Sequence, residues 1–479
     1  MKKKTIKLTA LAAACGITLL ACGCGGKQGN QTKPTNRTTN VYSSLVDYSA
    51  YADTRVSDIM VWRPPTDLSD EQWQWLKESG VNTIMTDSGI GGQRGAQFGS
   101  DSQKAYIEQC RKFGLSAMGY TNGNYNKNVK DYGDTDLYDT IAGIDYDDEP
   151  NINEFDAIAE VIPDFSEKYP GKKFFVCMLS GYAGAEHLGT TDYAEYLNAW
   201  YEKVLSQLPE GMPRVLATDV YPCHDSQNYG YEYINESWIR SLAYMGEMKM
   251  KHPELTLHIA MQSMSYGIKP SNSPRRAPTE NDCKFQFYVN AAFGFTDFSW
   301  FTYSMPPADD IEFTEDNMAM LDKNNRRTGV YYAVQKANAL IADLDEVLKS
   351  VSFAGVMPIA VKSATKEEQD TDDRAMRYLA KIDGAVIAAE DFDVLKSAAA
   401  DHNALISRFS DEGGNEGYML VNYGDPGRNK PANVTLNLID CNEAIIYRNG
   451  KPQTVSVKNN KLTVALGAGE GVYLIPYKK

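Results

Sequence analysis

The sequence predicts an α/β fold, a closed (β/α)8 barrel followed by a small all-β sandwich. From Asp58 to about Val347, short apolar segments typical of strands alternate with amphipathic segments typical of helices. Eight such pairs fit into about 290 residues, which suits a (β/α)8 barrel. After about Ser350 the helical pattern stops, and short strand-like segments are separated by turn residues. With 43% hydrophobic residues, the 479-residue chain can bury a sizeable core.

Several of the eight predicted barrel strands are near-continuous apolar runs, the pattern of a parallel sheet covered by helices. The predicted strands span 58–62, 81–86, 115–120, 141–144, 173–179, 215–220, 255–262 and 297–303. The predicted helices span 69–80, 102–113, 135–139, 154–169, 192–208, 235–251, 279–293 and 328–347. The alternative is an open doubly wound sheet, whose first strand usually leads into a glycine-rich phosphate-binding turn. Here Trp62-Arg63-Pro64-Pro65 follows the first strand, which favours the barrel.

The C-terminal part has closely spaced short strands, which favours a β-sandwich of about 130 residues. Asn449-Gly450 lies between two of them and is the dipeptide that favours a two-residue hairpin turn. We therefore expect a barrel domain over 46–349 and a sandwich domain over 350–479. The predicted sandwich strands span 377–382, 385–389, 405–409, 417–422, 433–437, 444–447, 454–457, 462–465 and 471–475.

The first 45 residues indicate export. Met1 is followed by three lysines and then by the apolar segment 8–20, which is too short to span a bilayer and remain there. Leu19-Leu20-Ala21-Cys22 resembles the cleavage signal of bacterial lipoproteins, which implies a signal peptide over 1–21 and a lipid on Cys22. Residues 22–45 form a polar, flexible tether. We expect a lipid-anchored protein on the extracytoplasmic face of the cell membrane; an ordinary signal peptide with a chance cysteine is the alternative.

Composition excludes several classes of partner and cofactor. The net charge of −15 argues against nucleic acid and against an anionic membrane surface, so we expect contact with the bilayer through the anchor alone. Beyond the tether, the five cysteines are scattered and show no metal-binding spacing, and the chain has five histidines in all. No nucleotide-binding loop is present. We therefore expect no metal and no cofactor, and the sequence leaves the oligomeric state open.

A cluster of acids follows the fourth predicted strand. The strand runs into Gly143-Ile144-Asp145-Tyr146-Asp147-Asp148-Glu149-Pro150, and a helix start follows. In a (β/α)8 barrel this end of each strand faces the active site. A glutamate there can protonate a leaving-group oxygen, as cleavage of a glycosidic bond requires, and Glu149 is our candidate. The three aspartates could equally cap the helix or face solvent.

The carboxyl ends of the other strands complete the candidate site. They carry aromatic rings, which can cover the apolar faces of a sugar, and carboxylates and amides, which can bond to its hydroxyl groups. Any single tyrosine among them could equally belong to the core. The candidate substrate-binding residues are Trp62, Arg63, Asp87, Tyr120, Asp147, Asp148, Tyr182, Tyr221, Gln262, Trp300 and Tyr303, and the candidate catalytic residues are Glu149 and Asp219.

Three short motifs carry a resemblance to a known superfamily. Asp148-Glu149-Pro150 after strand four, the segment 217–222 (Ala-Thr-Asp-Val-Tyr-Pro) and the unit 293–303 resemble the (β/α)8 glycoside hydrolases whose acid/base glutamate follows strand four. The resemblance covers roughly 58–344. It implies a carbohydrate substrate and hydrolysis of a glycosidic bond with Glu149 as general acid. Many bacterial members also carry a terminal β-domain.

The seventh predicted strand departs from that pattern. Retaining members place a nucleophilic glutamate at its end, where this chain has Ala260-Met261-Gln262-Ser263. Three possibilities remain open: Asp219 is the second carboxylate, Glu280 reaches in from its loop, or the barrel is a non-catalytic glycan-binding protein of the cell surface.

Three further groups are weaker candidates. His224-Asp225 could form a pair at the site, and Arg275-Arg276 could bind a uronate or a sulfate on the substrate. Asp309-Asp310 with Glu312 could bind calcium. Each of the three could also be an ordinary polar loop.

Overall fold

The computed structural model of the chain describes residues 57–87, 100–121, 135–226, 231–267, 274–307, 313–314, 316–382 and 384–477. The predicted signal peptide, the tether and Cys22 lie outside these residues, as does the acidic group 309–312. Within the described ranges, every helix is too short or too polar to cross a bilayer.

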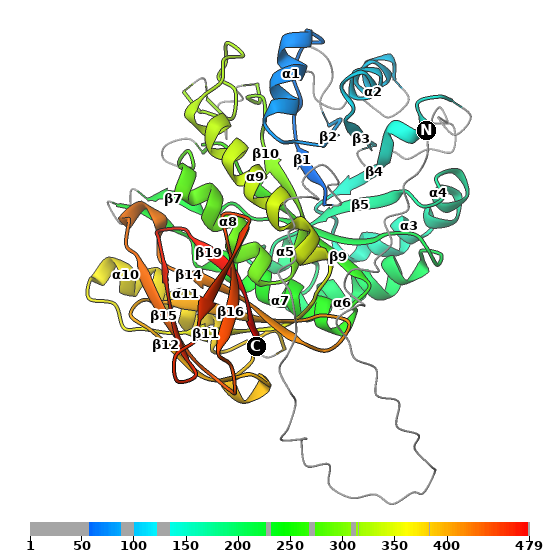
Figure 1. Cartoon of the computed structure of the whole chain (residues 1–479). Helices are drawn as coiled ribbons and strands as arrows, with labels where there is room; N and C mark the ends of the chain where they lie inside the picture. The colour runs from blue at the N-terminus through cyan, green and yellow to red at the C-terminus, as the bar shows by residue number, and fades with distance from the viewer. Residues whose placement is uncertain are drawn as a thin grey trace, which may run out of the picture.

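Eight parallel strands close into a barrel, as predicted (Figure 1). Their order around the barrel is β1-β10-β9-β6-β5-β4-β3-β2. The predicted apolar runs account for all eight, and β9 has the bounds predicted from the sequence. Strand β4 is longer than predicted, because it continues through the acids to Asp148. The strands are β1 (Ile59–Val61), β2 (Thr83–Met85), β3 (Ser116–Tyr120), β4 (Ile141–Asp148), β5 (Lys173–Met178), β6 (Arg214–Asp219), β9 (Leu255–Gln262) and β10 (Phe295–Phe301).

Helices follow the strands and cover the outside of the barrel. The predicted helix over 154–169 is broken in two, because Pro163 has no backbone N–H to continue a helix and lies instead in the first turn of the second one. The main helices are α1 (Asp70–Glu78), α2 (Asp101–Phe113), α3 (Phe155–Ala159), α4 (Ile162–Lys168), α6 (Tyr193–Lys203), α7 (Ser237–Lys251), α8 (Glu280–Ala292) and α9 (Gly329–Lys349). The shorter ones are η5 (Tyr138–Thr140), η6 (Ile152–Glu154), α5 (Ala185–Leu188) and η7 (Leu205–Gln207).

An antiparallel hairpin that was not predicted lies between β6 and α7. It consists of β7 (Cys223–Ser226) and β8 (Tyr231–Ile234). Its first strand also bridges to the loop after β9, through His224 and Arg275. The hairpin therefore supports that loop at the carboxyl end of the barrel.

Two antiparallel sheets form the C-terminal sandwich, as predicted. Asn449 and Gly450 both adopt positive φ, 49° and 69°, and join β16 to β17 as the predicted two-residue turn. The six-stranded sheet has the order β11 (Ser352–Ile359), β13 (Ala404–Ser410), β14 (Glu416–Asn422), β19 (Gly471–Tyr477), β16 (Glu443–Arg448) and β17 (Lys451–Ser456). The three-stranded sheet has the order β12 (Leu395–Ala400), β15 (Ala432–Leu438) and β18 (Lys461–Leu466).

The connection before β12 differs from the prediction. The segment 377–382, predicted as a strand, contains the end of helix α11 (Asp372–Leu379), which follows the short helix α10 (Lys366–Asp370). Ala375, Met376 and Leu379 are buried, a helical spacing that places them on one face. The segment 385–389 forms a single bridge, from Val386 to Val356, before the turn η8 (Ala389–Asp391). Strands β11 and β12 were not predicted.

One apolar core joins the barrel to the sandwich. Helices α7 and α8 pack against the six-stranded sheet, and side chains from both parts belong to the same buried cluster. Phe293 of the barrel and Phe353, Phe409 and Tyr473 of the sandwich are among its members. A separate core fills the space between the two sheets. The sandwich is thus packed directly on barrel helices rather than linked through a flexible segment.

Candidate active site

A pocket of about 290 Å³ opens at the carboxyl end of the barrel strands. Three carboxylates, one guanidinium and several aromatic rings line it. Each barrel strand from β4 to β6, together with β1, β9 and β10, contributes through its end or through the loop that follows. The lining residues are Trp62, Asp148, Glu149, Cys177, Tyr182, Asp219, Tyr221, Tyr266, Arg275, Phe301 and Phe313.

A bulge in β4 selects which aspartates face the barrel axis. Asp145 is in register with Phe175 of β5, and Asp148 is in register with Cys177. The two aspartates are three residues apart in β4, whereas Phe175 and Cys177 are two residues apart in β5. Phe175 and Cys177 belong to the cluster that fills the barrel interior. The extra residue in β4 therefore lets both aspartates point inward. Asp147 lies beside them and accepts a hydrogen bond from the backbone N–H of Asp148 at 2.9 Å.

Asp145 is fully buried below the pocket. Neither of its carboxylate oxygens has a hydrogen-bond partner within the part of the chain that the structure describes. Burial, with Asp148 and Asp87 nearby, raises the pKa of Asp145 well above its ordinary value. An ion without a partner is costly in an apolar interior, so this environment favours the protonated form of Asp145.

Asp148 opens to solvent in the pocket, among other acids. Desolvation raises its pKa well above the ordinary value, and the negative charges of Asp219 and Glu149 raise it further. Asp219 and Glu149 come from different strands and both act on Asp148, so the three carboxylates are close neighbours. Like charges in one pocket disfavour one another, and the group therefore retains protons that isolated carboxyls would lose.

Glu149 adopts a left-handed backbone conformation, with φ at 54°. This region costs a non-glycine residue on the order of 1–3 kcal/mol, and such strain gathers at functional sites. The backbone N–H of Glu149 donates to the carbonyl of Cys177 at 2.7 Å, which keeps the residue attached to β5. The side chain is exposed in the pocket. Arg63, at the end of β1, has the same φ of 54°.

Asp219 ends β6 and lines the same pocket. Burial raises its pKa, while a hydrogen bond from the Tyr221 side chain and the positive charge of Arg275 oppose the shift. Within the described residues, each influence on Asp148 raises its pKa. Burial thus raises the pKa of both aspartates, and at Asp219 the Tyr221 hydroxyl and Arg275 offset part of the rise.

Aromatic rings form one side of the pocket. The ring of Tyr221 lies 5.2 Å from that of Phe301 and 5.7 Å from that of Tyr266, the second pair edge to face at 87°. The ring centroids of Tyr266 and Phe313 are 6.0 Å apart. The guanidinium of Arg275 lies over the Tyr266 ring, 5.1 Å from its centroid. This wall of rings beside carboxylates suits a ligand with apolar faces and a polar edge.

Other predicted residues support the floor of the site without lining it. The carboxylate of Asp87 accepts a hydrogen bond from the backbone N–H of Arg63 at 2.8 Å, which ties the ends of β1 and β2 together. Burial and the charges of Asp145 and Asp148 raise the pKa of Tyr120, so its ring lies against the acids.

Three predicted substrate-binding side chains do not line the pocket. The indole N–H of Trp300 donates to Asn338 of α9 at 2.7 Å, and the hydroxyl of Tyr303 donates to the Gln72 carbonyl in α1 at 3.4 Å. Both are fully buried. Phe301, the next residue after Trp300 on β10, faces the pocket, because successive side chains of a strand point to opposite faces. Tyr303 lies beyond the end of this strand. Gln262 binds backbone groups on the loops after β6 and β9, with the Cys223 N–H at 2.8 Å and the Arg276 carbonyl at 2.8 Å.

Of the remaining candidates, Arg275 lines the pocket, whereas Glu280 and His224 do not. The carboxylate of Glu280 pairs with Lys284 and Lys336 at 2.5 Å each on the outer helices. His224 is buried next to Tyr233 and Asn235, and desolvation lowers its pKa to about 3, so it is neutral. Among the described residues, no group of three histidine, cysteine or acidic side chains could hold a metal ion.

Sequence reasoning missed part of the pocket. Phe313 lies in the region after β10, where no periodic pattern marks it. Cys177 was not among the predicted site residues, yet it lines the pocket; the alternation along β5 places it on the same inner face as Phe175 and could have revealed it. Tyr266 reaches the pocket from the loop after β9, as does Arg275, which the sequence offered only as a weaker candidate.

Comparison with known proteins adds the following. No protein-family model matches the chain, and no curated protein matches it. Solved structures similar to it include an α-amylase from Anoxybacillus (10% identity, TM-score 0.41, 88% of this chain and 98% of that one). A β-L-arabinopyranosidase from Geobacillus stearothermophilus is also similar (9%, 0.39, 89% and 98%). So is a β-galactosidase from the psychrophilic Marinomonas ef1 (10%, 0.36, 61% and 60%), of which this chain spans less than two thirds. Likeness at this level carries no conclusion about activity.

Proposed function

We propose that this protein is a glycoside hydrolase, with Glu149 as general acid and Asp219 as second carboxylate. One observation carries the proposal: Asp148, Glu149 and Asp219 open into a single pocket with an aromatic wall, at the end of the barrel where active sites of this fold lie. Carboxylates that differ in environment are what acid-assisted glycosidic cleavage uses.

In the proposed reaction, a sugar ring lies against Tyr221 and Phe301. Glu149 gives its proton to the glycosidic oxygen as the bond between that oxygen and the anomeric carbon breaks. Asp219 in its ionised form stabilises the positive charge that develops at the anomeric carbon. Water then adds its hydroxyl to that carbon and gives its proton to one of the carboxylates of the group. Asp148, adjacent to Glu149 and Asp219, forms a hydrogen bond to the substrate and keeps one proton among the three carboxyl groups.

The location of Glu280 favours Asp219 as the second carboxylate. Glu280 pairs with two lysines on the outer helices and does not line the pocket. Asp219 lines it and receives support for its anionic form from Tyr221 and Arg275. Of the three possibilities that the sequence left open, the structure thus supports Asp219 over Glu280.

A non-catalytic glycan-binding protein is the second candidate. The observation that favours it is the absence of a carboxylate at the end of β9, where Gln262 is occupied with backbone groups. Incubation of the protein with a panel of oligosaccharides, followed by product analysis and calorimetry, separates the two. Released sugar that disappears in Glu149→Gln supports hydrolysis. Binding without any product supports the second candidate and refutes the first.

We also propose that the protein is exported and held at the membrane by a lipid on Cys22, on the strength of the N-terminal sequence. Cys22→Ser should move the protein from the membrane fraction to the soluble fraction while its thermal unfolding stays unchanged. An unchanged membrane fraction would exclude Cys22 as the lipidated residue.

A further inference from the structure

Two adjacent arginines on the loop after β9 point to different parts of the molecule. Arg275 lines the pocket, with its guanidinium above Tyr266. Arg276 is buried in the junction between the barrel and the sandwich. Neighbouring residues of an extended segment point to opposite sides, which explains how consecutive side chains serve both places.

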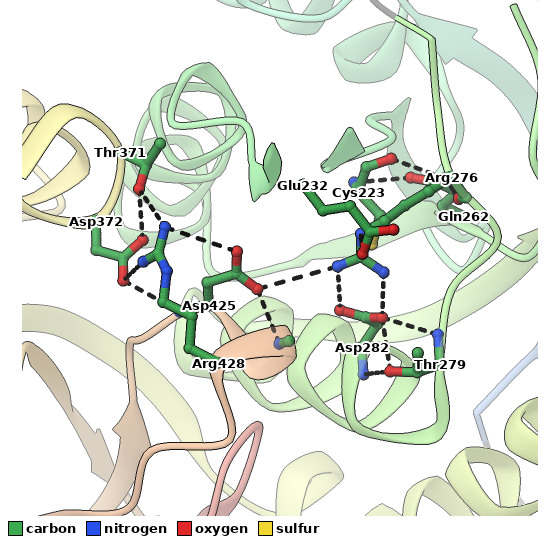
Figure 2. A network of polar contacts seen from close by, with 11 residues as sticks. Cys223, Glu232, Gln262, Arg276, Thr279, Asp282, Thr371, Asp372, Asp425 and Arg428 are labelled. Carbon is green, nitrogen blue, oxygen red and sulfur yellow. Dashed lines mark hydrogen bonds and ion pairs between the residues drawn. The ribbon is translucent and has the colours of Figure 1, made fainter. Parts of the chain in front are cut away.

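Arg276 is bound on several sides at once (Figure 2). Its guanidinium makes two parallel hydrogen bonds to the fully buried carboxylate of Asp282 in α8, at 2.5 and 2.8 Å. The carboxylate of Glu232 in β8 lies 3.3 Å from Nε of Arg276, and the carboxylate of Asp425 in the sandwich lies 4.0 Å from its Nη2. A two-pronged contact of this kind fixes the plane of the guanidinium as well as its position.

The sandwich side of the junction is itself ordered by charge. Asp425 lies 3.9 Å from Arg428 and accepts a hydrogen bond from the backbone N–H of Gly427 at 2.9 Å. Arg428 in turn donates to Asp372 at 2.7 Å, and Asp372 accepts from the backbone N–H of Asp425 at 3.2 Å. Figure 2 shows this second arginine–aspartate group facing the first, with Asp425 between them.

Backbone hydrogen bonds around Arg275 and Arg276 connect the junction to the pocket. Arg275 and Tyr266 exchange two backbone hydrogen bonds, at 2.8 and 3.2 Å. The N–H of Arg276 donates to the carbonyl of Cys223 at 3.1 Å, and its own carbonyl accepts from Gln262 at 2.8 Å. A shift of Arg276 therefore shifts Arg275 and the ring of Tyr266, which packs on Tyr221.

We propose that Arg276 is a positioning residue for the active site, through which Asp282 of the barrel and Asp425 of the sandwich hold Arg275 beside Asp219. The sandwich then contributes to the site without touching the substrate. This rests on the proposed function for the role of Asp219, while the positioning itself can be tested without turnover.

The test uses the full-length chain and three variants. Arg276→Lys keeps the charge and loses the planar fork, and Asp425→Asn removes the charge on the sandwich side. The matched control is Arg374→Lys, at an ion pair between the half-exposed Arg374 of α11 and Glu236 (3.0 Å). This pair also joins the two parts of the molecule but does not reach the pocket. Hydrogen exchange of the Tyr266, Arg275 and Arg276 amides is measured in each folded protein.

We expect these three amides to exchange about ten times faster in Arg276→Lys, measurably faster in Asp425→Asn and unchanged in Arg374→Lys. Unchanged exchange in Arg276→Lys overturns the proposal. If Arg276→Lys does not fold, Asp425→Asn decides, and unchanged exchange there has the same meaning.

Turnover gives the second measurement. Loss of a neighbouring cation raises the pKa of a carboxyl, so in Arg276→Lys the acidic limb of the kcat/KM profile should move up by about one pH unit. Arg275→Gln should produce the same movement with the Arg276 amide still protected. A wild type that cleaves no glycan refutes the proposed function, and the exchange measurement then decides the positioning role alone. Faster exchange with an unmoved acidic limb refutes the link to Asp219.

Discussion

The two ends of the barrel carry buried acids in opposite circumstances. At the amino end, Asp297 is bonded to Lys173 at 2.9 Å and to Lys349 at 2.7 Å, and Asp58 pairs with the same Lys173. These cations hold the pKa of Asp297 well below its usual value. At the carboxyl end, Asp145 has no bonding partner among the described residues, and the pKa of Asp148 is raised. The barrel thus pairs Asp297 with two cations at its amino end and leaves Asp145 without a partner among the described residues at the end where chemistry is proposed.

The largest effect should come from the carboxyl end. Glu149→Gln keeps the shape of the side chain but cannot give up a proton, so kcat should fall by about 10²–10⁴-fold with little change in sugar affinity. Asp219→Asn should also lower kcat strongly. Glu280→Gln is the control, since its ion pairs lie outside the pocket. Steady-state kinetics on an oligosaccharide substrate checks all three, and inactivation by Glu280→Gln instead would reassign the second carboxylate.

The amino end should respond in the opposite way. Asp297→Asn leaves Lys173 and Lys349 buried without full compensation, so the free energy of unfolding should fall by about 3–5 kcal/mol. The kcat of the folded fraction should stay unchanged. Urea denaturation measures the first quantity, with Asp370→Asn at an exposed helix pair as a control that should cost less than about 1 kcal/mol. A large loss of kcat in folded Asp297→Asn would show that the two ends are not separate in function.

The junction should add a pH dependence of its own. Desolvation raises the pKa of Asp425 to about 6 in the folded protein, although Arg428 and Arg276 oppose the shift. The folded state therefore binds this proton more tightly than the unfolded state, and the contribution of Asp425 to stability falls as the pH rises from about 4 to about 6. At about 1.36 kcal/mol for each unit of pKa, the contribution of Asp425 to the free energy of unfolding should change by about 3 kcal/mol over this interval.

The measurement is the free energy of unfolding of wild type and Asp425→Asn at pH 4 and at pH 6.5. The wild type should lose stability relative to the variant over this interval. Parallel curves for the two proteins would mean that Asp425 titrates normally.

The smallest effect concerns the hydrogen bond between Tyr221 and Asp219. Tyr221→Phe keeps the ring that packs on Phe301 and removes the hydroxyl that supports the anion. We expect kcat/KM to fall about tenfold and its acidic limb to move to higher pH, because a carboxylate that loses a donor is protonated more easily. The pH profile of kcat/KM provides the check. An unmoved limb would indicate that Asp219 is not the group that must be ionised.

The barrel could be predicted because apolar runs that alternate with amphipathic helical segments are typical of the parallel strands of a (β/α)8 barrel. Strand β9 has the predicted bounds, and the turn at Asn449-Gly450 needed only a local rule. The strand prediction for 377–382 was wrong because a short apolar run of six residues fits either period, and the burial of Met376 and Leu379, with contacts between α11 and α7, favoured the helix.

The acids of the site could be predicted because the carboxyl ends of parallel strands meet on one side of the barrel. The orientation of Trp300 could not, since it depends on which residue of β10 faces inward, and Phe301 does. Tyr303 lies beyond the end of β10, where no strand periodicity applies. The backbone conformation of Glu149 and the bulge in β4 leave no mark in the sequence either. The path of the loop that brings Arg275 to the pocket depends on contacts with β7 and the sandwich, which lie far away in the chain.

Asp282 takes part both in the start of helix α8 and in the ion pair with Arg276, and this limits which residues can replace it. Its carboxylate closes the first turn of α8 by accepting from the N–H and the hydroxyl of Thr279, and it also binds Arg276. A helix start of this kind generally accepts glutamate or glutamine at the same place. Here either would be one methylene too long to satisfy the helix and the arginine together within a sealed space, and asparagine would keep the cap and lose the ion pair. Any natural variant that retains both Thr279 and Arg276 should therefore retain aspartate at 282.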